Sequence, residues 1–369
     1  MGIPAETFAT DALFQPLKLG RINVANRMAM APLTRSRAND ALEPTDMVVE
    51  YYRQRASVGL IIAEATQISP TAQGYTHTPG IHTPEQIAAW KQVTDAVHAQ
   101  GGKIFLQLWH TGRMSHNAFQ PNQQAPVAPS SIAAKAKTYI VGQGYVNCAV
   151  PRALETAEIA GVVNDFRQAA ANAIEAGFDG VEIHGAHGYL IDAFLRDGSN
   201  HRTDPSGGSI ENRARFLLEV MAAVTQEIGA DRVGIRLSPV SPVNDSSESN
   251  PQPLFEHVVR ELEKLHPVYI HVVEGHTGGP RDNAPFDYEA LRRLYSGVWM
   301  VNNGYTKEMA VDALRSGRAD MVSFGRAMIT TPDLPRRFRD NLPLNEPFAD
   351  APVYGGTGPH GYTDYPALP

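Results

Sequence analysis

Short runs of hydrophobic residues alternate with longer amphipathic stretches along this chain. The short runs have the length and composition of buried strands, and the longer stretches repeat their apolar positions every three or four residues, as helices do. In Glu155–Ala176, for example, one predicted helical face carries Ile159, Val162, Val163, Phe166, Ala170 and Ile174. We count eight units of a strand followed by a helix, which indicates parallel strands joined by helices.

Eight such units favour closure into a barrel over an open sheet. No G-x-G-x-x-G pattern follows the first strand, as a dinucleotide-binding half would require. The predicted strands are Arg27–Met30, Leu60–Glu64, Lys103–Leu108, Gly180–Ile183, Val233–Leu237, Tyr269–Val273, Val298–Val301 and Met321–Phe324. The predicted helices are Met47–Ser57, Pro84–Ala99, Glu155–Ala176, Ile210–Met221, Pro253–Leu265, Tyr288–Leu294, Thr306–Ser316 and Pro332–Asp340. We therefore predict an α/β fold, a single TIM (β/α)8 barrel domain over residues 1–369.

Long loops are expected at the carboxyl face of the strands. The longest, Met114–Arg152, is polar and rich in proline, and its composition is typical of a loop that includes a small hairpin. Active sites of such barrels lie at this face, so its loops are where function is expected.

Composition narrows the function classes. The net charge of −7 without a basic stripe argues against a nucleic-acid partner. No apolar run is long enough to span a membrane, and Met1–Thr10 lacks the regions of a secretory signal. The one cysteine, Cys148, excludes an internal disulfide or an iron–sulfur cluster built from this chain alone. We expect a cytoplasmic protein, monomeric or homodimeric, with no nucleic acid or membrane as partner.

Candidate chemistry gathers in one stretch after the strand Gly180–Ile183. There, His184, His187 and Tyr189 follow within six positions at the carboxyl end of the strand. A single histidine at a strand end is usually structural, and the tyrosine could simply pack its ring. A His-x-x-His pair also suits zinc, but no second cluster of potential ligands is evident. Spacing alone therefore indicates a site and leaves its chemistry open.

Glycines at the ends of the last two strands suggest a phosphorylated ligand. Asn302–Gly304 follows strand seven and Gly325–Arg326 follows strand eight. Loops at these two positions of a TIM barrel often hold a phosphate with backbone N–H groups.

Several motifs together resemble the Old Yellow Enzyme family of FMN-dependent ene-reductases. They are LFQPLKLG, NRMAMAPLTR, EYYRQRASVGLIIAEAT, LQLWHTGR, IHGAHGYLIDAFLRDGSN with GGSIENRARF, GIRLSP, VNNGY, SFGR and GYTDYP, and they span nearly the whole chain. Within the family, the His-x-x-His pattern is similar to the bacterial branch of glycerol trinitrate and N-ethylmaleimide reductases.

The resemblance implies non-covalent FMN at the mouth of the barrel. The residues that match flavin and phosphate positions are Pro32, Leu33, Thr34, Ala65, Gln107, Arg236, Asn303, Gly304, Gly325 and Arg326. Thr34 would bond the flavin C4 carbonyl. Gln107 and Arg236 would face the N1 and O2 edge, where a guanidinium stabilises the negative charge of the reduced form.

The resemblance also implies the reaction. NADPH or NADH would provide a hydride that passes through the flavin to the β carbon of an electron-poor alkene: an α,β-unsaturated carbonyl, a maleimide or a nitroalkene. The implied activity extends to nitrate esters, and no metal is implied. His184 and His187 would donate hydrogen bonds to the substrate oxygen, and Tyr189 would protonate the α carbon. Residues that match the substrate pocket are Tyr75, Trp109 and Tyr354.

Some positions depart from the family pattern, and two other functions stay open. Ser206 replaces a usually aromatic residue, while Asn244 and His276 lie in variable loops. One alternative is a zinc-dependent barrel hydrolase that uses His184 and His187. It is disfavoured because the other strand ends carry few zinc-binding residues. The second is a flavin-binding redox sensor without turnover.

Overall fold

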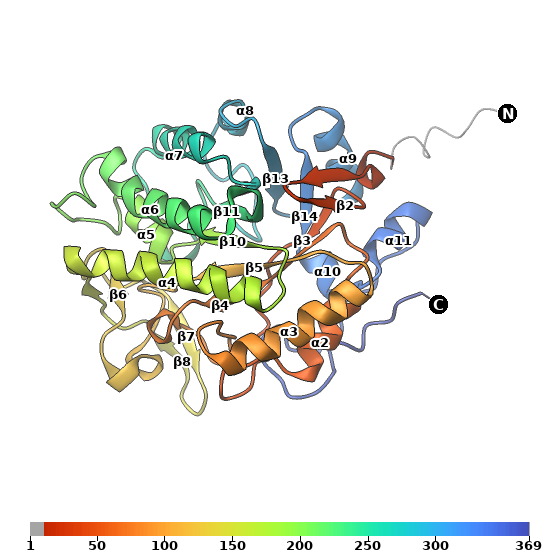
Figure 1. Cartoon of the computed structure of the whole chain (residues 1–369), viewed down its shortest axis with the longest axis horizontal. Coiled ribbons are helices and arrows are strands. Elements are labelled where there is room, and N and C mark those ends of the chain that lie inside the picture. Colours follow the sequence, from red (N-terminus) through yellow and green to blue (C-terminus); the bar gives the residue numbers. More distant parts are fainter. Residues whose placement is uncertain (1–10, 369) are drawn as a thin grey trace.

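The structure, a computed structural model, describes residues 11–368 (Figure 1). Residues 1–10 and 369 lie outside the described part. The predictions of a single domain over residues 1–369 and of no secretory signal in Met1–Thr10 therefore extend beyond the described residues. Eight parallel strands form a closed barrel, which confirms the predicted (β/α)8 fold. In spatial order they are β3 (Met28–Met30), β4 (Leu60–Gln67), β5 (Ile104–Trp109), β10 (Gly180–Gly185), β11 (Val233–Leu237), β12 (Tyr269–Val273), β13 (Val298–Asn302) and β14 (Met321–Phe324).

Helices surround this barrel. They are α2 (Asp46–Arg53), α3 (Pro84–Ala99), α4 (Thr156–Glu175), α5 (Leu190–Leu195), α6 (Ile210–Ile228), α7 (Pro251–Leu265), α8 (Tyr288–Arg292), α9 (Lys307–Arg315), α10 (Arg326–Thr330) and α11 (Leu334–Asp340). In the described residues, no helix combines the length and apolar character needed to cross a membrane.

Two helical predictions need correction. The helix predicted to end at Met221 continues to Ile228, because Val224 is fully buried and extends its apolar face. It ends at Gly229, whose φ of 92° few other residues adopt. The short helix α10 was not predicted, since five residues carry too little periodicity to be detected.

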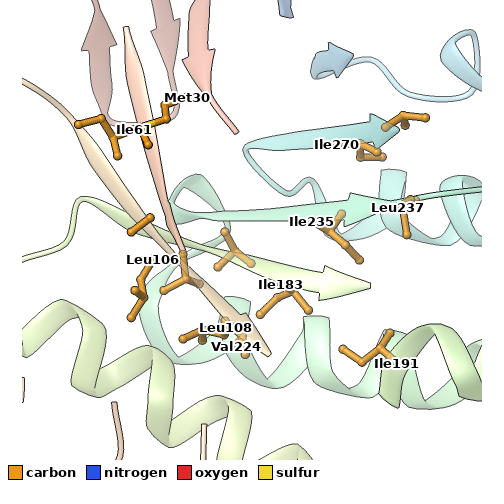
Figure 2. Packing of buried hydrophobic residues seen from close by; sticks show 14 of the residues in the cluster. Met30, Ile61, Leu106, Leu108, Ile183, Ile191, Val224, Ile235, Leu237 and Ile270 are labelled. Atoms are coloured by element: carbon orange, nitrogen blue, oxygen red, sulfur yellow. The ribbon is translucent and has the colours of Figure 1, made fainter. Parts of the chain in front are cut away.

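Successive side chains of each barrel strand point to opposite faces, so the strands separate two hydrophobic layers. One face of each strand packs outward against the helices, as Figure 2 shows for Leu106, Ile183 and Ile235 of the barrel with Val224 of α6. The other face fills the barrel interior with Ala29, Leu60, Ile62, Phe105, Tyr269, Met300 and Met321. Because the interior is solid at its base, a ligand can enter only from the opposite end.

A short hairpin that was not predicted closes the base. It consists of β1 (Leu17–Leu19) and β2 (Ile22–Val24), and its Leu19 and Val24 pack against the interior residues. Its turn requires Gly20, because φ is +57° there and a Cβ would lie 2.0 Å from the Asp231 carbonyl oxygen.

The opposite, carboxyl face carries the long loops. The predicted loop Met114–Arg152 contains the expected hairpin, formed by β7 (Lys137–Ile140) and β8 (Gly144–Asn147) and drawn in yellow in Figure 1. It also contains β6 (Val127–Ala128), which pairs with β9 (Arg152–Ala153). The candidate residues lie at this carboxyl face, in the segments that follow the barrel strands.

Candidate active site

The three residues singled out after the fourth barrel strand lie together. His184 occupies the last inward position of β10, and Tyr189 directly precedes α5. The ring centroid of His184 lies 5.5 Å from that of His187 and 4.9 Å from that of Tyr189. Three polar rings therefore surround one small region at the mouth of the barrel.

The turn that presents these rings is held by buried polar contacts. His187 and Gly188 have φ values of +61° and +73°, so two consecutive residues adopt the left-handed conformation. The Gly188 N–H donates to the Asp192 carboxylate at 2.8 Å, and the amide of Asn244 donates to the His187 carbonyl at 2.9 Å. Asp192 in turn forms a buried ion pair with Arg196 at 2.8 Å. These bonds offset the cost of the strained turn.

Both histidines are neutral. Burial lowers the pKa of each well below its usual range, and the Arg236 guanidinium lowers both further. The Ala186 N–H donates to His184 Nδ1 at 3.3 Å, so the proton of neutral His184 lies on Nε2. His184 Nε2 is therefore a hydrogen-bond donor.

Tyr189 keeps its proton at neutral pH. Burial raises its pKa to about 12, although a hydrogen bond with Tyr75, with the hydroxyl oxygens 3.2 Å apart, acts in the opposite direction. Its ring centroid lies 4.8 Å from that of Trp109, which stacks on Tyr75 at 5.6 Å. Tyr354, from the far end of the chain, contributes electrostatically to Tyr189 while 65% of its own side chain is exposed. The rings of Tyr75, Trp109 and Tyr189 thus form one cluster at the mouth, and within the described residues Tyr354 makes no ring contact with them.

A polar layer lies below the histidines, inside the barrel. Gln107 donates through Nε2 to Glu182 Oε1 at 2.7 Å, and the other carboxylate oxygen is 2.8 Å from His271 Nδ1. His271 Nε2 is 2.7 Å from Ser323 Oγ, so the chain of bonds crosses the barrel. With Nε2 occupied, Gln107 has its carbonyl oxygen left as an acceptor.

Arg236 adds a positive charge to this layer. Its Nη2 donates to Asn302 Oδ1 at 2.8 Å, and its buried Nε has no partner within residues 11–368. Burial lowers the pKa of this guanidinium, and Glu182 acts against that effect. A cation with an unpaired donor beside an amide acceptor suits the N1–N3 edge of a flavin.

The first two barrel strands supply the opposite wall. Pro32, Leu33 and Thr34 follow β3, and Ala65 lies where the register between β4 and β5 shifts. Beside it, the Arg35 N–H donates to the Glu64 carboxylate at 3.3 Å, and burial raises the pKa of Glu64 to about 7.

The phosphate position is predicted at the ends of the last two strands. Asn303 has a φ of +111°, a conformation costly for any residue but glycine, and Gly304 has open space where a Cβ would be. Gly325 precedes α10, which starts at the exposed Arg326. Within the described residues, no hydrogen bond engages the N–H of Gly304. A backbone donor without a partner at one strand end and an exposed arginine at the next fit a phosphate such as that of FMN.

Several polar groups of the site were missed by sequence reasoning. They are Glu182, His271, Ser323, Thr277 and Ser241. Thr277 contacts His187, and Ser241 contacts Thr277. Alternation along β10 could have indicated Glu182, which shares the inward face with His184. Thr277 and Ser241 lie in irregular loops that carry no such signal. The doubtful Ser206 is buried, and its carbonyl accepts from the Asn200 amide at 2.8 Å, so the loop packs without an aromatic residue.

A zinc centre lacks ligands here. Across residues 11–368, no group of three His, Cys, Asp or Glu side chains could hold a metal ion. His184 and His187 therefore have no third protein ligand among these residues.

Comparison with known proteins identifies the class. Residues 12–345 match the model of the NADH:flavin oxidoreductase / NADH oxidase family. A putative 12-oxophytodienoate reductase 11 from Oryza sativa subsp. japonica is 48% identical over 98% of this chain and 99% of its own length. Morphinone reductase superposes with a TM-score of 0.92 at 47% identity over 96% of each chain. The Old Yellow Enzyme homologue from Zymomonas mobilis has a TM-score of 0.92 at 42% identity over 96% of this chain and 99% of its own.

Fold, site and comparisons define a flavin-dependent oxidoreductase on a TIM barrel. The chain belongs to the NADH:flavin oxidoreductase / NADH oxidase family and, within it, to the Old Yellow Enzymes. It is an ene-reductase of that family, which uses FMN and NAD(P)H.

Proposed function

We propose that this protein reduces the C=C bond of α,β-unsaturated carbonyl compounds, maleimides and nitroalkenes. The observation that carries the proposal is the grouping of the His184, His187 and Tyr189 rings at the barrel mouth. FMN, when bound, would supply the redox chemistry, which is the transfer of hydride from NAD(P)H to the β carbon. The remaining work is done by side chains.

The histidines stabilise the charge that develops on the substrate. As hydride reaches the β carbon, negative charge accumulates on the carbonyl or nitro oxygen, and His184 Nε2–H and His187 donate hydrogen bonds to it. The imidazoles act here as neutral donors, because burial and the nearby Arg236 guanidinium disfavour their protonated forms. Arg236 and Gln107 would hold the N1–N3 edge of the bound cofactor.

Tyr189 completes the reaction by donating its phenolic proton to the α carbon. Its pKa of about 12 keeps the proton in place until the carbanionic α carbon forms. Tyr75, Trp109 and Tyr354 form the wall that orients the alkene and limits water.

The relatives support ketone substrates. The compounds in the names 12-oxophytodienoate reductase and morphinone reductase are both ketones. Nitrate esters belong to the same proposal, since their oxygens would accept from the same two histidines.

The test is an anaerobic spectral titration of the FMN-loaded protein. We expect NADPH to bleach the flavin absorbance and 2-cyclohexenone to restore it. We expect His184→Ala to slow the second step strongly and the matched change His201→Ala, at an exposed imidazole, to leave it unchanged. Reduced flavin that persists in the presence of cyclohexenone, N-ethylmaleimide and a nitroalkene would favour a redox sensor and refute the proposal. Glycerol trinitrate added to the reduced protein tests the nitrate-ester activity in the same cuvette.

A further inference from the structure

A loop from another part of the barrel reaches the candidate oxyanion site. Residues 274–287 connect β12 to α8, and within them Thr277 Oγ1 lies 2.8 Å from His187 Nε2. No residue of this loop has a role in the reaction described above. The contact nevertheless occupies one of the two ring nitrogens of His187, which is proposed to donate a hydrogen bond to the substrate oxygen.

Thr277 is held in place from the end of β13. The Asn303 amide donates to the carbonyls of Glu274 at 2.7 Å and His276 at 2.9 Å, and its oxygen accepts from the Gly278 N–H at 3.1 Å. The backbone on both sides of Thr277 is thus fixed by one side chain. The threonine hydroxyl is therefore a positioned group and not a chance contact of a mobile loop.

A second hydroxyl stands behind the first. Ser241 Oγ lies 3.1 Å from Thr277 Oγ1 and accepts from the Thr277 N–H at 3.3 Å. Because its acceptor side faces that N–H, Ser241 can donate its own proton to Thr277 Oγ1. Thr277 then has its proton available for His187 Nε2.

We propose that Thr277 is a positioning residue that holds His187 in the tautomer with its proton on Nδ1. A neutral imidazole has one donor and one acceptor nitrogen, so a proton received at Nε2 leaves Nδ1–H as the donor. His187 Nδ1 has no hydrogen bond within the described residues. The two histidines then present different nitrogens, His184 Nε2–H and His187 Nδ1–H, to one substrate oxygen.

This inference rests on the proposed function for the role of the donor, but the tautomer itself is separately measurable. The relay from Ser241 through Thr277 also makes His187 a better donor, because successive hydrogen bonds polarise one another. Loss of the threonine hydroxyl would free the imidazole to take either tautomer or to rotate.

The test compares Thr277→Val, which keeps the shape, with Thr277→Ser, which keeps the hydroxyl. Thr94→Val on α3 is the matched control, since that buried hydroxyl bonds only to backbone carbonyls. In ¹⁵N spectra of histidine-labelled protein, we expect His187 to show a protonated Nδ1 in the wild type and in Thr277→Ser. Thr277→Val should shift its two nitrogen signals toward a mixture of tautomers, and Thr94→Val should not.

The second measurement is the affinity of the FMN-loaded protein for para-hydroxybenzaldehyde, whose phenolate resembles the enolate. We expect Thr277→Val to raise Kd about tenfold, the weight of one hydrogen bond, and Thr277→Ser to raise it less than twofold. In a His187→Ala background, Thr277→Val should change Kd no further. The inference would be overturned if Thr277→Val raised Kd about equally in the His187→Ala background. It would also be overturned if the ¹⁵N spectrum of Thr277→Val matched that of the wild type. If the wild type binds no phenol while the tautomer still depends on Thr277, the proposed function fails and the tautomer assignment stands.

Discussion

The most direct test of the proton donor is the substitution Tyr189→Phe. It removes one hydroxyl and keeps the ring, whose centroid lies 4.8 Å from that of Trp109 and 6.4 Å from that of Tyr75. A positioned general acid contributes about 10²- to 10⁴-fold to a rate. The Tyr75 hydroxyl, 3.2 Å from that of Tyr189, can substitute as a more distant donor. We therefore expect a loss of about 10²-fold, at the lower end of that range.

Stopped-flow spectroscopy separates the two half-reactions. The proton is needed only when the alkene is reduced, so reoxidation of the flavin by 2-cyclohexenone should slow while reduction by NADPH changes less than twofold. The double variant with Tyr75→Phe should approach the loss of about 10⁴-fold. In the wild type, reoxidation should not depend on pH between 6 and 9, because a group with a pKa of about 12 stays protonated throughout. Equal slowing of both half-reactions by Tyr189→Phe would refute the assignment.

Three further predictions concern other parts of the site. His187→Ala should raise Kd for phenols about 10- to 100-fold by equilibrium titration, since it removes one hydrogen bond to an anion; an unchanged Kd would exclude His187 from the oxyanion position. Burial raises the pKa of Glu64 from 4.5 to about 7, so the stability tied to its proton is complete below pH 4.5 and is lost as pH rises through 7. In urea unfolding, the wild type should lose about 3 kcal/mol of its free energy of unfolding between pH 4.5 and 8, and Glu64→Gln should keep it. Parallel pH profiles of the two proteins would contradict this reasoning. Asp192→Ala leaves Arg196 buried without its partner and should cost about 3–5 kcal/mol, against at most about 1 kcal/mol for Asp231→Ala in an exposed ion pair; equal costs would show that burial does not matter here.

Much of the barrel could be predicted from the sequence. Each barrel strand is a short apolar run, and each long helix repeats its apolar positions, so local pattern and tertiary environment agree. The base hairpin β1–β2 was missed because three-residue strands leave almost no periodic signal, and it is defined by packing on the interior. The helix α6 was cut short for a similar reason, since Val224 is the one buried residue in its last seven positions.

The site residues likewise fall into those that a local sequence pattern indicates and those that it does not. His184, His187 and Tyr189 stand out because they follow a strand that periodicity identifies. The contacts among Thr277, Ser241 and His187 join segments 36 and 90 positions apart, and no local pattern records them. Motif resemblance indicates which residues are expected at the cofactor, whereas the residues that orient them depend on three-dimensional packing. The assigned roles of the individual site residues stay predictions until the variants are measured.

The way Arg35 binds the far end of the chain has a consequence for the order of assembly during synthesis. Its guanidinium donates to the carbonyls of Val353 at 2.9 Å and Gly361 at 2.8 Å, across separations of 318 and 326 positions. The barrel is likewise closed only when β14 pairs with β3. A ribosome-bound chain that lacks its last fifty residues therefore has neither a closed barrel nor a complete mouth. The barrel mouth, where the cofactor is expected, is thus completed only by the last part of the chain to be synthesised.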